Sequence, residues 1–272
     1  MRALISLLLS MASLDAPAAS RHPGPHVVTV TAVDFHYRAP LTVKPGVTTF
    51  RLLNAGTQVH HLQVVRLNEG KHLPDLVAAL KNPGPPPAWM VQVGGPNAMV
   101  PHGTPVEATV GLEPGTYVLL CFVPSPGEQI PHAMKGMMKE LTVSAGTTTM
   151  AEPKGDVDVR LTDYAFTFST PLTRGKHMVR VTNDAAQPHE LTLFKLAPGK
   201  TAADVGHWAE SGMKGPPPGM PIGGVTGLST GRSSTFTVKL AAGHYGLVCF
   251  LPDAKDGKPH LAHGMTQDVT VE

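Results

Sequence analysis

Four side chains able to bind a soft or borderline metal ion occur twice, in the same order, along the chain. The order is His, Cys, His, Met, and the two sets are His60, Cys121, His132, Met137 and His189, Cys249, His260, Met265. One thiolate and two imidazoles in a trigonal arrangement, with a weak axial thioether, form a blue-copper site. The pattern therefore predicts copper as the cofactor, with one mononuclear site per set and at least one site loaded.

Each of these residue types also has a structural explanation when it is taken singly. A free cysteine packs like a small apolar residue, and methionine fills gaps in a core. A single histidine in a turn is usually a surface residue. The repetition of one ordered set favours metal binding over these alternatives. His61, His263 and Met134 lie beside the sets, and we expect them to be surface residues.

The two sets belong to a longer internal repeat. Residues 48–67, TTFRLLNAGTQVHHLQVVRL, match residues 177–196, HMVRVTNDAAQPHELTLFKL, at an offset of 129. Residues 115–137 match residues 243–265 at an offset of 128. A duplicated unit of this length has the size of a domain. We predict four regions: a signal peptide (1–19), domain 1 (24–146), a linker (147–155) and domain 2 (156–272).

Each repeat is predicted to consist mainly of strands. Residues 27–35 and 157–166 alternate between apolar and polar side chains, which is typical of a half-buried strand. The chain is rich in turn formers, with 28 Gly and 27 Pro. Helical spacing is confined to 73–81 and 201–210, with Asp75 and Thr201 as starting signals. The expected fold class is all-β: two tandem Greek-key β-sandwich domains, each with one short helix.

At the repeated motifs the chain resembles the cupredoxin family, the plastocyanin and azurin type. The shared features are a histidine after an Asn-containing turn, a G-x-Y-x-x-x-C strand and a His-x-x-x-Gly-Met segment, and they occur in both repeats. The resemblance implies a cupredoxin-like sandwich with its ligands in loops at one end. It also implies metal-ligand roles for the eight residues of the two sets.

Two features depart from the family pattern. Ten residues separate Cys121 from His132, and ten separate Cys249 from His260, where the family usually has only a few. Such a loop can return to the site, or it can open the site towards a less blue geometry. In addition, His61 and Glu190 stand where the family often has an Asn that fastens the ligand loop, so we expect support for the loop from elsewhere.

The N-terminus and the composition indicate an exported protein. Arg2 and the apolar run 3–14, followed by Ala16-Pro17-Ala18, resemble a signal peptide, and about 12 apolar residues are too few to span a bilayer. This predicts a periplasmic or secreted protein with no stable membrane insertion. The net charge of +2 and the lack of a Lys/Arg block argue against nucleic acid as a partner. Two cysteines at equivalent repeat positions argue for ligands over an interdomain disulfide.

These observations favour an electron carrier that docks a redox partner protein over the loop of His132 or His260, where an imidazole edge is expected near the surface. Copper trafficking or storage, or metal-free recognition of a partner, is the alternative. Two-domain copper oxidases and nitrite reductases join their copper sites through Cys-His and add His-x-His ligands. Here Cys121 and Cys249 precede Phe, and His-x-His is missing, so an enzyme is not expected.

Overall fold

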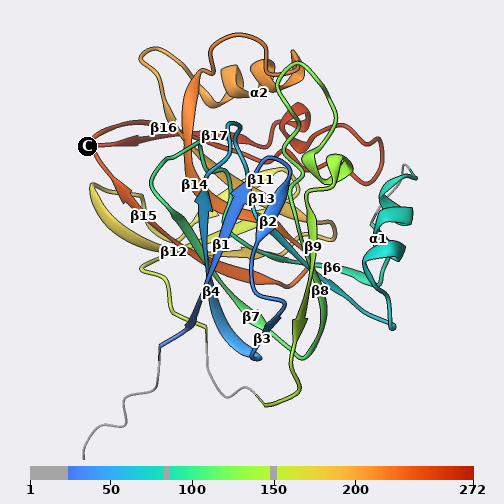
Figure 1. Ribbon diagram of the computed structural model, residues 1–272. Coiled ribbons are helices and arrows are strands. Elements are labelled where there is room, and N and C mark those ends of the chain that lie inside the picture. Colours follow the sequence, from blue (N-terminus) through green and yellow to red (C-terminus); the bar gives the residue numbers. More distant parts are fainter. Residues whose placement is uncertain (1–23, 83–85, 148–151) are drawn as a thin grey trace, which may run out of the picture.

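The computed structural model describes residues 24–82, 86–147 and 152–272. The predicted signal peptide and part of the predicted linker lie outside these ranges. Within them the chain forms two large β-sheets with one α-helix in each half (Figure 1). The expected all-β fold class, with two sandwiches and one short helix each, is confirmed.

The first half of the chain supplies nine strands, helix α1 (Leu73–Leu80) and the short 3-10 helix η1 (His132–Lys135). The strands are β1 (His26–Val33), β2 (His36–Arg38), β3 (Thr42–Val43), β4 (Gly46–Asn54), β5 (Gln63–Leu67), β6 (Met90–Gly94), β7 (Val106–Leu112), β8 (Gly115–Leu120) and β9 (Met138–Val143).

Within residues 152–272 the second half follows the same order, without a counterpart of β3. It supplies helix α2 (Ala202–Glu210) and the 3-10 helix η2 (His260–His263). The strands are β10 (Val157–Thr162), β11 (Ala165–Phe168), β12 (Gly175–Asn183), β13 (His189–Leu196), β14 (Gly219–Leu228), β15 (Ser233–Leu240), β16 (Gly243–Val248) and β17 (Thr266–Val271).

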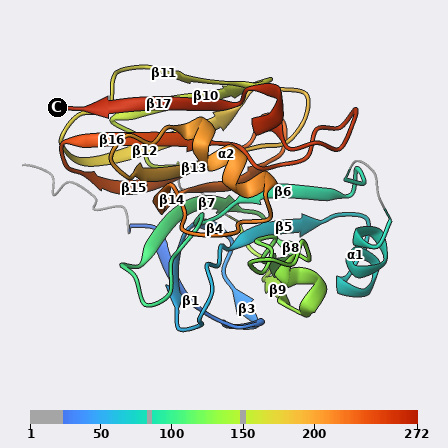
Figure 2. The same cartoon turned by 90° about the horizontal axis from the view of Figure 1, so that it is seen from above.

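The two halves share both sheets. One sheet runs β11-β10-β12-β15-β7-β4-β1-β2, and the other runs β17-β16-β13-β14-β6-β5-β8-β9-β3. The halves therefore meet edge to edge, where β15 pairs with β7 and β14 with β6, as Figure 2 shows. This pairing covers edge strands that would otherwise be open to other chains.

The register of this junction relates equivalent positions of the sequence repeat. Ala108 lies opposite Phe236, at an offset of 128, and Pro96 lies opposite Val225, at an offset of 129. Each residue of such a pair thus meets its own counterpart. The junction has the self-complementary character of a two-fold interface, within a single chain.

Each half has its own hydrophobic core, which lies between the two shared sheets. Strand β10 shows the origin of this core, because its residues alternate strictly between buried and exposed. The core of the first half contains Cys121 and Met137, and that of the second contains Cys249 and Met265. The ligand candidates are therefore built into the packed interior, where low mobility is expected.

The helices lie where helical spacing predicts them. Helix α2 begins after Thr201, whose hydroxyl accepts a hydrogen bond from the N–H of Asp204 at 3.2 Å. Helix α1 begins at Leu73, and the carboxylate of Asp75 accepts the N–H of His72 at 3.0 Å. Neither helix in the described ranges is both long and apolar enough to cross a membrane.

Candidate metal centres

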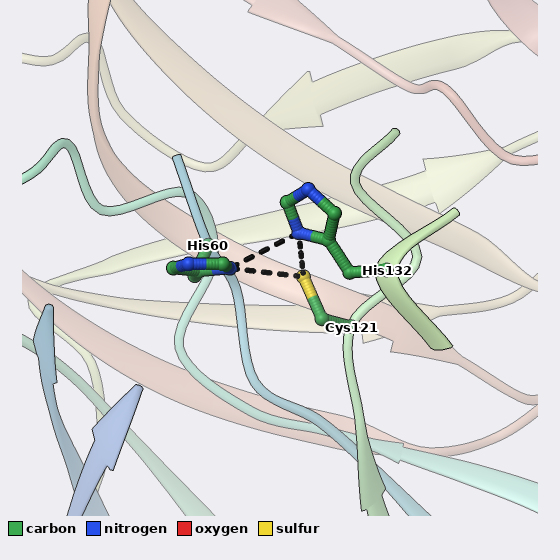
Figure 3. Close-up of side chains that lie close together, drawn as sticks. All are labelled: His60, Cys121 and His132. Carbon is green, nitrogen blue, oxygen red and sulfur yellow. Dashed lines mark hydrogen bonds between the residues drawn. The ribbon is translucent and has the colours of Figure 1, made fainter. Parts of the chain in front are cut away.

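Three members of the first predicted set, His60, Cys121 and His132, come together as a buried triad (Figure 3). His60 follows β4, Cys121 follows β8, and His132 is the first residue of η1. The Cys121 sulfur lies 3.9 Å from Nδ1 of His60 and 3.5 Å from Nδ1 of His132, and the two Nδ1 atoms are 3.0 Å apart. All three residues are 0% exposed. One thiol and two imidazoles thus face a common point.

The outer nitrogens of the two rings are turned away from that point. Nε2 of His60 lies 2.6 Å from Oδ1 of Asp34, and Nε2 of His132 lies 3.0 Å from Oε1 of Gln58. Both oxygens accept hydrogen bonds, so each Nε2 carries the proton and each Nδ1 presents a lone pair to the centre. The hydrogen bonding therefore selects the tautomers that a metal ion requires.

The second set forms the matching triad in the second sandwich. The Cys249 sulfur lies 3.9 Å from Nδ1 of His189 and 3.3 Å from Nδ1 of His260, and the two imidazole rings are 4.3 Å apart between centroids. Nε2 of His189 lies 2.7 Å from Oδ1 of Asp163. The cysteine and histidine contacts of the first triad are thus repeated, whereas Nε2 of His260 has no hydrogen-bond partner among the residues that the structure describes.

Burial controls the protonation of both triads. It lowers the pKa of His132 and of His260 to about 4, and it raises the pKa of Cys121 to about 12 and that of Cys249 still further. Near neutral pH without a metal, the imidazoles are therefore neutral and the cysteines are thiols. A bound cation would take a thiolate and two neutral imidazoles, the donor set that fits copper.

The two methionines lie directly beside their triads. The N–H of Met137 donates to the carbonyl of His132 at 2.9 Å, and its own carbonyl accepts the N–H of Cys121 at 3.3 Å. Met265 makes the same pair with His260 at 3.0 Å and Cys249 at 3.2 Å. Both side chains are fully buried. Their role as axial ligands stays a prediction.

The ten-residue loops return to the site in both halves. An isolated β-bridge joins Pro124 to Pro131 in the first loop, and another joins Pro252 to Pro259 in the second. Inside the first bridge the N–H of His132 donates to the carbonyl of Val123 at 2.9 Å. The additional residues therefore form a loop beyond the β-bridge, and the three residues of each triad stay close together.

The residues after the first histidines support the ligand loops, contrary to our expectation. Nε2 of His61 accepts the N–H of Phe122 at 2.8 Å, and Oε1 of Glu190 accepts the N–H of Phe250 at 3.1 Å. Each bond ties the first-histidine loop to the strand end that carries the cysteine. His61 is also buried, so its prediction as a surface residue is wrong, whereas Met134 and His263 do reach the surface.

Asn97 of the first half bonds to the second half across the junction. Its buried amide nitrogen lies 2.8 Å from Oγ1 of Thr192 and 3.4 Å from Oε2 of Glu190. Burial raises the pKa of Glu190 to about 7 and lowers that of His61 to about 3. The two centres therefore share one buried polar layer, with a carboxyl on one side and a neutral imidazole on the other.

Several residues that shape the triads were missed in the sequence. They are the carboxylates Asp34 and Asp163, which follow the first strand of each half, and the amides of Gln58 and Gln187. Both pairs are separated by the same offset of 129 as His60 and His189. A full comparison of the two repeats would have found them.

Cys121 and Cys249 are both free and buried, which agrees with ligand roles over a disulfide. Neither His132 nor His260 exposes an imidazole edge, since both are 0% exposed. The expected surface approach of an imidazole is therefore wrong. In the first half the partly exposed side chain of Gln58 covers Nε2 of His132.

Comparison with known proteins gives distant similarity only. No protein-family model and no curated protein matches the sequence. A reduced auracyanin from Roseiflexus castenholzii is 22% identical over 45% of this chain and 100% of its own, with a TM-score of 0.30. Auracyanin A, a "blue" copper protein from Chloroflexus aurantiacus, is 23% identical over 44% of this chain and 100% of its own, with a TM-score of 0.32.

Another similar structure covers more of this chain, at a lower identity and a lower TM-score. The copper-containing nitrite reductase of Thermus scotoductus is 13% identical over 90% of this chain and 61% of its own, with a TM-score of 0.24. At these identities and TM-scores no family is assigned. The function has to be argued from the side chains of the two triads.

Proposed function

We propose that the chain is an exported copper protein with two mononuclear centres of the blue type, and that it carries electrons. One observation supports this most strongly: two neutral imidazoles turn their Nδ1 lone pairs toward each other at 3.0 Å, next to a thiol. Facing lone pairs repel one another in a dry interior, whereas a cation between them binds both. The donor set of two nitrogens and one sulfur favours copper.

Complete burial of the ligands favours an electron carrier over a trafficking protein. All six triad residues are 0% exposed, and a β-bridge closes the neck of each ligand loop. A copper ion held there can leave only if the loop opens, which suits a retained cofactor. Rigid packing around the triads also keeps the ligands in place when the ion changes oxidation state.

The surface near the first centre suits a protein partner. Ile130 is 49% exposed and Met134 is 43% exposed, and they flank His132 in the loop and in η1. Large apolar side chains exposed around a redox centre favour brief docking of another protein. We therefore keep a redox partner protein as the proposed partner, with Gln58 as the residue between it and His132.

We do not assign an enzymatic reaction to the chain. An oxidase or nitrite reductase of the two-domain type would need a conductive Cys-His link and further histidine ligands. Cys121 and Cys249 are followed by Phe122 and Phe250. Both phenylalanines instead donate their N–H groups to the supporting residues of the ligand loops.

Export and domain organisation complete the proposal. Residues 1–19 would be removed as a signal peptide, and the mature protein would work in the periplasm or outside the cell. Residues 24–146 and 156–272 would be duplicated domains, each holding one copper ion. Metal-free partner recognition remains the alternative if neither triad takes up copper.

Redox cycling tests the proposed electron-carrier role. Copper-loaded protein is reduced with ascorbate and reoxidised with ferricyanide, while the copper–thiolate absorption and the bound copper are both measured. We expect one electron per copper in each direction, and no loss of copper to an excess of a Cu(I) chelator. Rapid transfer of the metal to the chelator, without reversible cycling, would identify a copper-handling protein instead.

A further inference from the structure

A second group of metal-binding side chains lies outside the buried triads. Asp253, Asp256 and His263 come from the loop before η2 and from its last residue, and their ligand atoms lie within 4.8 Å of one another. Nε2 of His263 is 3.2 Å from Oδ1 of Asp256. Asp256 and His263 are open to solvent, whereas Asp253 is buried.

In the first half, the ammonium group of a lysine side chain occupies the equivalent position. At the offset of 128, Ser125, Glu128 and Lys135 replace the three residues. Nζ of Lys135 donates to Oγ of Ser125 at 2.8 Å and to Oε2 of Glu128 at 2.5 Å. A side-chain ammonium thus fills the position between the loop and the 3-10 helix, which indicates that this position favours positive charge.

In the second half, no lysine among the described residues forms an ion pair with Asp253 or Asp256. This half has two carboxylates at the position instead of one, and His263 replaces the lysine. The ring of Tyr164 stacks on His263, with centroids 5.0 Å apart, and its hydroxyl donates to Oδ2 of Asp253 at 2.5 Å. The imidazole and one carboxylate are therefore held in place by the same aromatic side chain.

A buried nitrogen without a partner points into the same group. His260 is 0% exposed, and its Nε2 has no hydrogen-bond partner among the residues that the structure describes. The nearest carboxylate oxygen to this nitrogen is Oδ2 of Asp253, at 3.8 Å. In the first half Gln58 satisfies the corresponding nitrogen of His132, whereas Gln187 bonds to Asp253 instead, at 3.0 Å.

We propose that Asp253, Asp256 and His263 bind a divalent transition-metal ion, Cu(II) or Zn(II), at the surface of the second half only. Two carboxylates and one imidazole are hard to borderline donors, which suit these ions and not Cu(I). The site is distinct from the buried triad, and its existence does not depend on copper in that triad. An ion bound there lies on the outer side of His260 and marks an approach to the second centre.

The test is a Cu(II) titration of the full mature protein, followed by electron paramagnetic resonance and visible absorption. The proposal predicts one equivalent of Cu(II), in addition to any that the buried triads bind, which gives a tetragonal signal and adds nothing to the copper–thiolate band. His263→Ala and Asp256→Asn each weaken this equivalent at least about tenfold. His244→Ala is the control, because His244 is an exposed imidazole whose side chain contacts Thr270, and it leaves the titration unchanged.

The two metal proposals fail in different ways. If the copper–thiolate band is absent in all variants, only the proposal of copper in the buried triads is contradicted. Identical tetragonal signals in the wild type, His263→Ala and Asp256→Asn would overturn the surface site. The converse variant combines Ser125→Asp with Lys135→His in the first half, where Glu128 is retained. It should add a second tetragonal equivalent, and its failure to do so would contradict the equivalence of the two positions.

Discussion

His60 and His132 face each other through their Nδ1 atoms at 3.0 Å, and each has its Nε2 bonded to an oxygen on the outside of the site. A thiol proton from Cys121 can satisfy one of the two lone pairs, but the other stays unpaired in a buried pocket. An unpaired buried acceptor costs about 1–3 kcal/mol. A copper ion removes this cost by binding both nitrogens and the sulfur.

The carboxylates outside the triads should tune copper affinity. Burial acts to raise the pKa of Asp34, but hydrogen bonds from Thr57 and His60 lower it to about 2, so this carboxylate is ionised at neutral pH. Asp34→Asn should weaken copper at the first centre about 10–100-fold, because the imidazole loses a charged partner. Asp184→Asn removes an exposed carboxylate that pairs with Arg160 and should leave the affinity unchanged. Competition titrations of the two variants measure the difference.

Copper uptake at the first centre should release about one proton between pH 5 and 8. Burial raises the pKa of Cys121 to about 12 and lowers that of His132 to about 4. Between pH 5 and 8, therefore, only the thiol has a proton to lose. The apparent copper affinity should therefore rise about tenfold per pH unit. Isothermal titration calorimetry in buffers of different ionisation heat counts the protons. Release of none would show that the thiol does not bind.

The two centres should differ in the pH dependence of their reduction potentials. Burial raises the pKa of Glu190 to about 7, and this carboxyl accepts the N–H of Phe250, the residue after Cys249, at 3.1 Å. Its ionised form stabilises Cu(II) more than Cu(I), so the potential of the second centre should fall as pH rises through about 7. His61 stays neutral above about pH 3, so the first centre should show no such step.

Spectroelectrochemistry of single-centre variants, carrying Cys121→Ser or Cys249→Ser, resolves the two potentials. Glu190→Gln should remove the step at the second centre. Parallel pH profiles at both centres would contradict a role for this carboxyl.

Asn97 should matter for stability far more than an exposed asparagine. Its amide nitrogen lies 2.8 Å from Thr192 and 3.4 Å from Glu190, in the buried layer between the halves. Asn97→Ala leaves these acceptors without a donor and should lower the free energy of unfolding by about 1–3 kcal/mol. Asn82→Ala removes an exposed side-chain bond to Ala78 and should change it by less than about 0.5 kcal/mol. Equal effects in urea unfolding would show that the layer is not stabilising.

The sequence predicted the parts of the molecule that follow from local pattern and from repetition. Alternation identified strands such as β10, the motif at Thr201 predicted the start of α2, and the repeated His-Cys-His order identified both triads. A donor set can be predicted in this way because metal ions restrict the residue types that bind them.

Long-range partners could not be predicted from the same signals. The contact of Asp34 with His60 depends on how β1 and β4 pair, and the position of Asn97 depends on how the two halves meet. The β-bridges in the ten-residue loops could not be predicted either, since the Pro124–Pro131 bridge forms only when the chain folds back. The ten-residue loops therefore do not separate the members of either triad.

Titration of metal-free mature protein with Cu(II) tests the central claim most directly. Visible absorption and electron paramagnetic resonance are recorded together for the wild type, Cys121→Ser and Cys249→Ser. We expect an intense copper–thiolate band that saturates at two thiolate-bound equivalents and is halved by each substitution. If no thiolate band appears in any of the three proteins, the buried triads are not copper centres of the blue type and the electron-carrier proposal is wrong.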